Sequence, residues 1–249
     1  MDFLGIDVPV KHVPELDPGF IPMGKFFSAF LADAKQPLDI AVERAGGEVA
    51  VYHTFIHGTA EFAGADRYYA DRLVKFLLWC MGGFKVYIAG SEEIYEYISA
   101  AYRKGGSREF DADFMANVYE RPFEVVRCDA VPAEYSNPQS VGRHLDGCRI
   151  GFDAGGSDRK VVWYPKVTED PDYHYEGIVS ALKSAAEHMP RVDAVGVSSA
   201  GIYINNRTMV ASLFLKVPPE LFDAKVKDIY IRAVRDTFGD IPVVVANDG

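Results

Sequence analysis

The chain has 249 residues, of which 49% are hydrophobic, 13% aromatic and 25% charged, and its formal net charge is −10. This balance is typical of a globular protein with one large domain or two moderate ones, and it excludes a disordered chain. The acidic charge and the lack of a lysine/arginine run exclude an ordinary nucleic-acid-binding protein, so an anionic ligand would have to be held locally, by backbone amides and a metal ion.

In chain order, the first half of the sequence predicts a small α/β domain after an irregular segment, 1–22, that is rich in Pro, Gly and Asp. The predicted elements are a helix over 23–34, a β-hairpin over 38–58 that turns at Gly46-Gly47, a helix over 60–81, a strand over 84–90, a helix that opens at Ser91 and a strand over 123–129. The polar, proline-containing stretch 132–140 predicts a domain boundary. We therefore expect one domain over 1–146 and a second over 147–249.

The second half predicts strands that alternate with helices. Its elements are strands over 148–156 and 160–166, a helix over 176–189, strands over 193–201 and 208–215, a helix over 224–238 and a strand over 241–249. Such alternation is the pattern of an α/β fold.

The strongest chemical motif is GFDAGGSDRKV, residues 151–161. Asp153 ends a predicted strand, and Gly155, Gly156 and Ser157 make a tight turn. Glycine lets a backbone bend this sharply and approach a phosphate, and consecutive amides in such a turn bind anions. Asp153 would then face a magnesium ion through water, because Mg²⁺ keeps most of its hydration shell.

This motif resembles the glycine-rich loop that opens kinases of the hexokinase type and of the ROK (repressor, open reading frame, kinase) family. Two further motifs follow in the family's order, each at the end of a predicted strand: AVGVSSAG at 194–201 and VVVANDG at 243–249. Together the three motifs make 147–249 similar to a ribonuclease H-like lobe of the actin/hexokinase type with a mixed sheet, preceded here by another α/β domain.

The resemblance implies an ATP-dependent, magnesium-dependent sugar kinase. Asp248 would be the general base. Asp153, Gly155, Gly156, Ser157 and Lys160 would hold the nucleotide phosphates and magnesium, while Asn247, Ser199 and Gly201 would contact the sugar. The family also allows a homodimer.

The sequence departs from the family pattern in three places, one of which is SLFLKVPPE, residues 212–220, where the family often carries sugar-contacting residues. Only KVVWYPK, residues 160–166, follows the glycine loop, where the family has a full β-hairpin. The sequence stops one residue after Asp248, where the family continues into a second lobe, so we expect this chain to be the N-terminal part of a longer protein.

Other residues favour structural interpretations. His53 and His57 are predicted on a strand, where four residues span roughly 13 Å, too far for one zinc ion. Asp111 and Asp113 are expected to open a helix. Ala89, Gly90 and Ser91 could approach a nucleotide, although an accessory domain is the preferred interpretation.

Cellular context is predicted from two further features. Three widely spaced cysteines, Cys80, Cys128 and Cys148, are typical of reduced thiols. Neither a signal peptide nor a membrane-spanning segment is predicted, so we expect a cytoplasmic protein without a membrane partner.

Two alternatives remain beside the kinase. One is a non-catalytic sugar or nucleotide sensor of the same fold, and the other is a structural α/β domain in which the glycine turn is only a turn.

Overall fold

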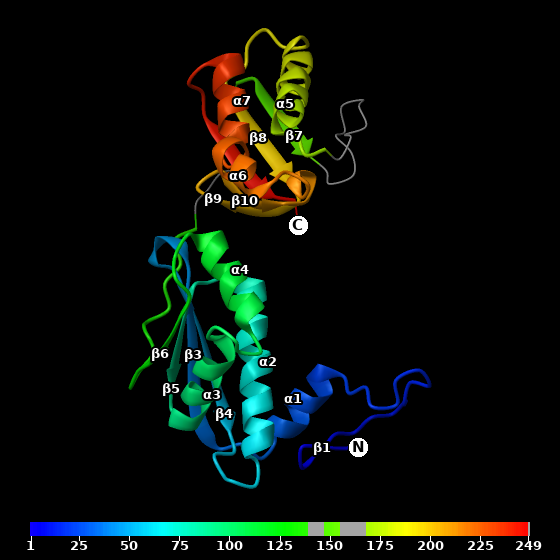
Figure 1. Ribbon diagram of the computed structural model, residues 1–249, viewed down its shortest axis with the longest axis vertical. Coiled ribbons are helices and arrows are strands. Elements are labelled where there is room, and N and C mark those ends of the chain that lie inside the picture. The colour runs from blue at the N-terminus through cyan, green and yellow to red at the C-terminus, as the bar shows by residue number, and fades with distance from the viewer. Residues whose placement is uncertain (139–146, 155–167, 249) are drawn as a thin grey trace. The chain divides into compact units, whose positions relative to one another are not determined.

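The computed structural model describes residues 1–138, 147–154 and 168–248, and it shows a mixed α/β protein (Figure 1). The chain divides into two compact units, Met1–Pro138 and Gln139–Gly249. Their boundary falls inside the polar stretch 132–140. The mixture of helices and strands confirms the predicted α/β class. The assignment to the actin/hexokinase type stays a prediction.

A four-stranded sheet in the order β4-β3-β5-β6 organises the N-terminal unit. Strand β3 pairs antiparallel with both β4 and β5, and β5 pairs parallel with β6. The strands are β3 (Gln36–Glu43), β4 (Val49–Ile56), β5 (Lys85–Ala89) and β6 (Glu124–Arg127), and the two-residue strands β1 (Asp2–Phe3) and β2 (Ile6–Asp7) form a separate hairpin. The predicted hairpin is confirmed, with the short 3-10 turn η1 (Ala45–Gly47) at its tip.

Helices cover one face of this sheet (Figure 1). They are α2 (Ala63–Met81), α3 (Glu92–Tyr102) and α4 (Glu109–Tyr119). Helix α1 (Met23–Leu31) contacts β2, and its Phe30 stacks on Tyr69 of α2. Alternate residues of β3, such as Leu38 and Ile40, are buried against α2, because strand side chains alternate between faces. The predicted N-cap of α3 is confirmed, since Ser91 Oγ accepts a hydrogen bond from Ile94 N at 3.3 Å.

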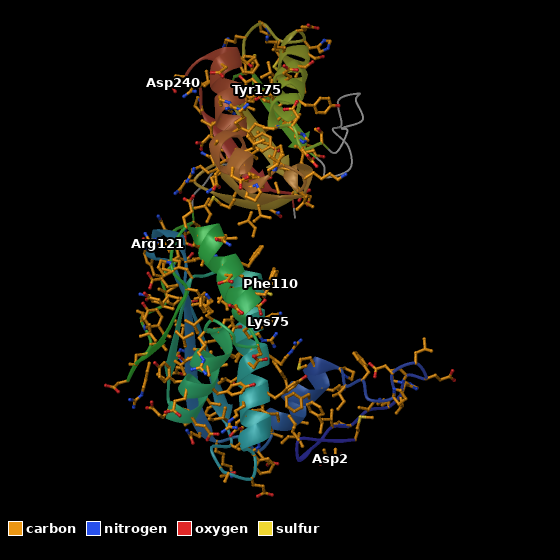
Figure 2. All side chains as sticks on the ribbon, viewed as in Figure 1. Asp2, Lys75, Phe110, Arg121, Tyr175 and Asp240 are labelled. Atoms are coloured by element: carbon orange, nitrogen blue, oxygen red, sulfur yellow. The ribbon has the colours of Figure 1, made fainter. Side chains whose placement is uncertain are left out.

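A buried charged network ties α2 to α4. Asp111, which is 2% exposed, accepts hydrogen bonds from Lys75 Nζ at 3.2 Å and from Trp79 Nε1 at 3.0 Å. Arg108 binds Asp71 through two nitrogens, and these bonds raise the pKa of Arg108. Figure 2 shows the side chains of Lys75 and Phe110, which mark the two helices. The network fixes how α4 lies on α2.

The C-terminal unit is built on a parallel sheet in the order β11-β8-β7. Its strands are β7 (Arg149–Ala154), β8 (Ala194–Ser199) and β11 (Val243–Asn247), and its main helices are α5 (Pro171–Ala186) and α7 (Ile229–Phe238). Helices α5 and α7 contact each other and share one apolar core with the sheet. They therefore cover the same face of it, as Figure 1 shows.

A second hairpin joins β8 to α7. It consists of β9 (Gly201–Ile204) and β10 (Arg207–Ala211), and the chain then passes through η2 (Ser212–Phe214), α6 (Pro219–Leu221) and the π-helical turn η3 (Phe222–Val226). Strand β9 is absent from the sequence prediction, and the helix predicted over 224–238 is divided into η3 and α7. The strand predicted over 160–166 lies outside the described residues. Within the described ranges, no helix has both the length and the apolar composition needed to cross a bilayer.

The Asp111 network predicts a measurable stability difference between two neighbouring acids. Asp111→Ala leaves Lys75 and Trp79 without their shared acceptor, and we expect a loss of about 2–3 kcal/mol, because Lys75 is only partly in water. Unfolding in urea, followed by Trp79 fluorescence in a Trp163→Phe background, measures it. Asp113→Ala is the matched control on the exposed side of α4, and its effect should stay below about 0.5 kcal/mol. Equal effects of the two substitutions would contradict the role given to Asp111.

Candidate functional site

Three predicted site segments meet at the carboxyl edge of the parallel sheet. Ala154 pairs with Ser199, and Ser199 pairs with Asn247, so the ends of β7, β8 and β11 form one row. Neighbouring strands lie about 4.8 Å apart, so the two outer strands are separated by roughly 10 Å. In open α/β sheets, ligands bind outside this carboxyl edge.

Asp153, which was predicted to face magnesium, and Asp248, the predicted general base, both lie at this edge. In β7, Phe152 and Ala154 are buried against the helices, so alternation turns Asp153 to the other face. Asp248 is the residue after Asn247, which is the last residue of β11. Asp153 is half-buried and Asp248 is exposed.

Ser199 stabilises the row of strand ends from the helix-covered face of the sheet. Its side chain is 1% exposed, and its Oγ donates a hydrogen bond to the carbonyl oxygen of Ala154 at 2.7 Å. Tyr230 of α7, also buried, donates to the same Oγ at 3.4 Å. Ser199, predicted to contact a sugar, therefore holds β7 to β8 in this structure.

Asn247 and Gly201 contact each other. Asn247 Nδ2 donates to the carbonyl oxygen of Gly201 at 2.7 Å, which joins the end of β11 to the start of β9. A Cβ atom on Gly201 would lie 2.2 Å from the carbonyl oxygen of Val210, so only glycine fits at this crossing. These two predicted sugar contacts thus also set the shape of the edge.

Asn206 is a positioning residue that the sequence analysis missed. Asn205 and Asn206 have φ values of 52° and 66° and form the two-residue turn between β9 and β10. The Asn206 amide accepts from Val245 N at 2.9 Å and donates to the Val243 carbonyl oxygen at 3.2 Å. It therefore fastens the hairpin to β11. The signal for it was present, because Asn-Asn between β-type residues predicts a tight turn.

Tyr203 is a second residue that the sequence analysis missed. Burial raises the pKa of its hydroxyl, and the negative charge of Asp248 raises it further. The tyrosine hydroxyl is protonated at neutral pH, as an unshifted tyrosine also is, and is a hydrogen-bond donor. No sequence pattern singled it out, because one tyrosine in a short strand is usually a packing residue.

The rest of the predicted nucleotide loop cannot be compared with the structure. Gly155, Gly156, Ser157 and Lys160 lie outside the described residues. Asp153 and Ala154, which lead into this loop, are the residues that place its start at the carboxyl edge.

The N-terminal unit has its own features of chemical interest. Gly90 and Ser91 line a cleft of about 240 Å³ at the carboxyl ends of β5 and β6, and Arg127 in that cleft is paired with Glu92 at 2.6 Å. His53 and His57 bind different carboxylates, Asp39 at 2.7 Å and Asp66 at 3.3 Å. The two histidines therefore do not act as one metal-binding pair.

The edge formed by Asp153, Asn247 and Asp248 brings a half-buried and an exposed carboxylate beside an amide. Such a group can bind a hydrated cation, accept hydroxyl hydrogen bonds and take up a proton. No family model, curated protein or solved structure matches the chain, so the function has to be inferred from this geometry.

Glycine substitution tests the packing at the edge. Gly201→Ala forces a methyl group against the backbone of β10, and we expect a loss of about 1–3 kcal/mol in the free energy of unfolding. Gly151→Ala is the matched control, since a Cβ there meets no atom within 4 Å. Urea unfolding followed by circular dichroism measures both. A Gly201→Ala protein as stable as Gly151→Ala would show that the close approach at β10 is absent.

Proposed function

We propose that the C-terminal unit belongs to an ATP-dependent kinase that transfers a phosphoryl group to a sugar hydroxyl. The observation that carries the proposal is that Asp153 and Asp248 lie at the same carboxyl edge of the sheet, near the ends of its two outer strands. Phosphoryl transfer needs one carboxylate near the phosphates and their metal ion and another near the accepting hydroxyl. Strands β7 and β11, separated only by β8, supply these two positions.

Magnesium fits the residues at the start of the glycine loop. Mg²⁺ prefers oxygen ligands, keeps several waters and uses one or two carboxylates together with substrate phosphates. Asp153 supplies one such carboxylate, and the described residues contain no group of three or more His, Cys, Asp or Glu side chains suited to a metal cage. Asp153 would hold the ion, which neutralises phosphate charge when bound.

Asp248 would accept the proton of the sugar hydroxyl. An exposed carboxylate just beyond a strand end is accessible to a substrate, and a positioned carboxylate of this kind is a suitable general base. The hydrogen bond from Asn247 to the Gly201 carbonyl oxygen holds the end of β11, and Asp248 is the next residue.

A non-catalytic sensor is the second candidate. The hydrogen bonds of Ser199 to Ala154 and of Asn247 to Gly201 occupy two side chains assigned to sugar binding. An edge held together in this way could bind a nucleotide or sugar without turnover. Binding and turnover therefore have to be measured separately.

Nucleotide binding tests both candidates against a purely structural domain. We expect calorimetry with Mg-ATP to give saturable heat for the wild type and a severalfold weaker affinity for Asp153→Ala, because the carboxylate that holds the ion is lost. Asp240→Asn is the control: Asp240, labelled in Figure 2, is exposed and precedes β11 at the opposite edge of the sheet. Absence of heat from the wild type would remove both ligand-binding functions.

Turnover separates the kinase from the sensor. In an assay with a panel of hexoses and N-acetylhexosamines, Asp248→Asn should lower kcat by about 10²- to 10⁴-fold, because the proton acceptor is lost. Its affinity for Mg-ATP should stay at the wild-type value, and Asp240→Asn should keep full activity. Nucleotide binding without phosphoryl transfer to any sugar of the panel would favour the sensor.

A further inference from the structure

The N-terminal unit contains a cavity of about 730 Å³ that the sequence analysis did not anticipate. It lies between β2, α1 and the loop from β4 to α2. Its lining combines apolar and polar side chains, among them Ile6, Lys25, Ser28, Asp33, His57 and Phe62. A volume of this size is in the range of small-molecule sites.

A buried histidine–aspartate pair forms one wall of the cavity. The side chains of His57 and Asp66 are 7% and 5% exposed. Asp66 Oδ1 accepts from the backbone nitrogen of His57 at 2.9 Å and lies 3.3 Å from His57 Nδ1, while Oδ2 accepts from Gly58 N at 2.8 Å. Phe30 contacts the imidazole edge-on and Phe62 stacks on it at 4.4 Å, so the ring is held in one orientation.

This arrangement determines what His57 offers to a ligand. A carboxylate only accepts hydrogen bonds, so Nδ1 carries the proton in the bond to Asp66. When the ring is neutral, Nε2 is an acceptor. Within the described residues no hydrogen bond to Nε2 is found, although the ring lines the cavity. A ligand that satisfies Nε2 must bring a hydroxyl or amine donor.

The other polar groups of the cavity narrow the class of ligand. Lys25 donates and Asp33 accepts, and their charges balance, while Asp7 is neutralised by the N-terminal ammonium group at 3.1 Å. Mixed donors and acceptors suit hydroxyl groups, each of which can both donate and accept. Ile6 and Phe62 supply an apolar surface for the C–H face of a ring.

We propose that this cavity binds a small uncharged polyhydroxylated molecule of the monosaccharide class, with one ligand hydroxyl donating to His57 Nε2. The site lies wholly within the N-terminal unit and is independent of the kinase proposal. In a protein that carries both sites, it would let a sugar be sensed away from the carboxyl edge of β7, β8 and β11.

Nitrogen NMR of the histidine rings in the full chain tests the proposal directly. Titration with D-glucose, N-acetyl-D-glucosamine and myo-inositol should shift the His57 Nε2 signal saturably with at least one of them. His53, whose ring is 74% exposed and bound to Asp39, is the internal control and should not shift. Absence of a saturable His57 shift with all three compounds overturns the proposal.

Two substitutions separate binding from folding. In His57→Asn the amide nitrogen can still donate to Asp66, but the acceptor at Nε2 is gone, so the affinity for the shifting compound should fall about tenfold. His53→Gln should leave the affinity unchanged. A folded His57→Asn protein, judged by circular dichroism, that binds as tightly as the wild type would also overturn the proposal.

Asp248→Asn distinguishes this cavity from the proposed kinase site. The His57 shift should persist in that variant with unchanged affinity, because the ligand binds in the N-terminal unit. A His57 shift that disappears in Asp248→Asn would assign the sugar to the carboxyl edge and overturn the second site. Loss of turnover alone would leave the His57 result intact.

Discussion

The C-terminal unit depends on the parallel pairing of β8 with β7 on one side and with β11 on the other. This pairing places Ala154, Ser199 and Asn247 in one row and brings together segments almost a hundred residues apart in sequence. The pairing alone leaves the strand ends free to fray. The Ser199–Ala154 hydrogen bond joins the ends of β8 and β7, and the Asn247–Gly201 hydrogen bond joins the end of β11 to β9. Asn206 holds the β9–β10 hairpin to β11.

The same hydrogen bonds explain why small and polar residues dominate the strand ends. A large apolar residue at position 199 could not reach the Ala154 carbonyl oxygen, and any side chain at position 201 would collide with β10. The motif AVGVSSAG therefore has a structural reason that does not require a substrate. The chemical interest of this motif comes from its neighbours, because Asp153 and Asp248 lie at the same stabilised edge.

Local patterns predicted most elements, and long-range contacts account for what was missed. Gly46-Gly47, Ser91 and the alternation in β3 and β4 are short-range signals, and they were interpreted correctly. The strand β9 was missed because its four residues have no independent periodicity and are ordered by pairing with β10. For the site, each of the three motifs was predicted to end a strand, and β7, β8 and β11 do end at one edge of the sheet. The cavity around His57 could not be predicted, because β2, α1 and the β4–α2 loop meet only in the folded unit.

The two proposed sites would bind ligands of different charge. With a net charge of −10, the protein repels a nucleotide at long range, so the carboxyl edge must attract it through a cation at Asp153 and through nearby backbone amides. An uncharged sugar is not repelled, and the His57 cavity needs only hydrogen-bonding groups and a well-oriented acceptor. The buried Asp66 supplies that orientation, since it fixes Nδ1 and leaves Nε2 for the ligand. Salt should therefore alter nucleotide affinity far more than occupancy of the His57 cavity.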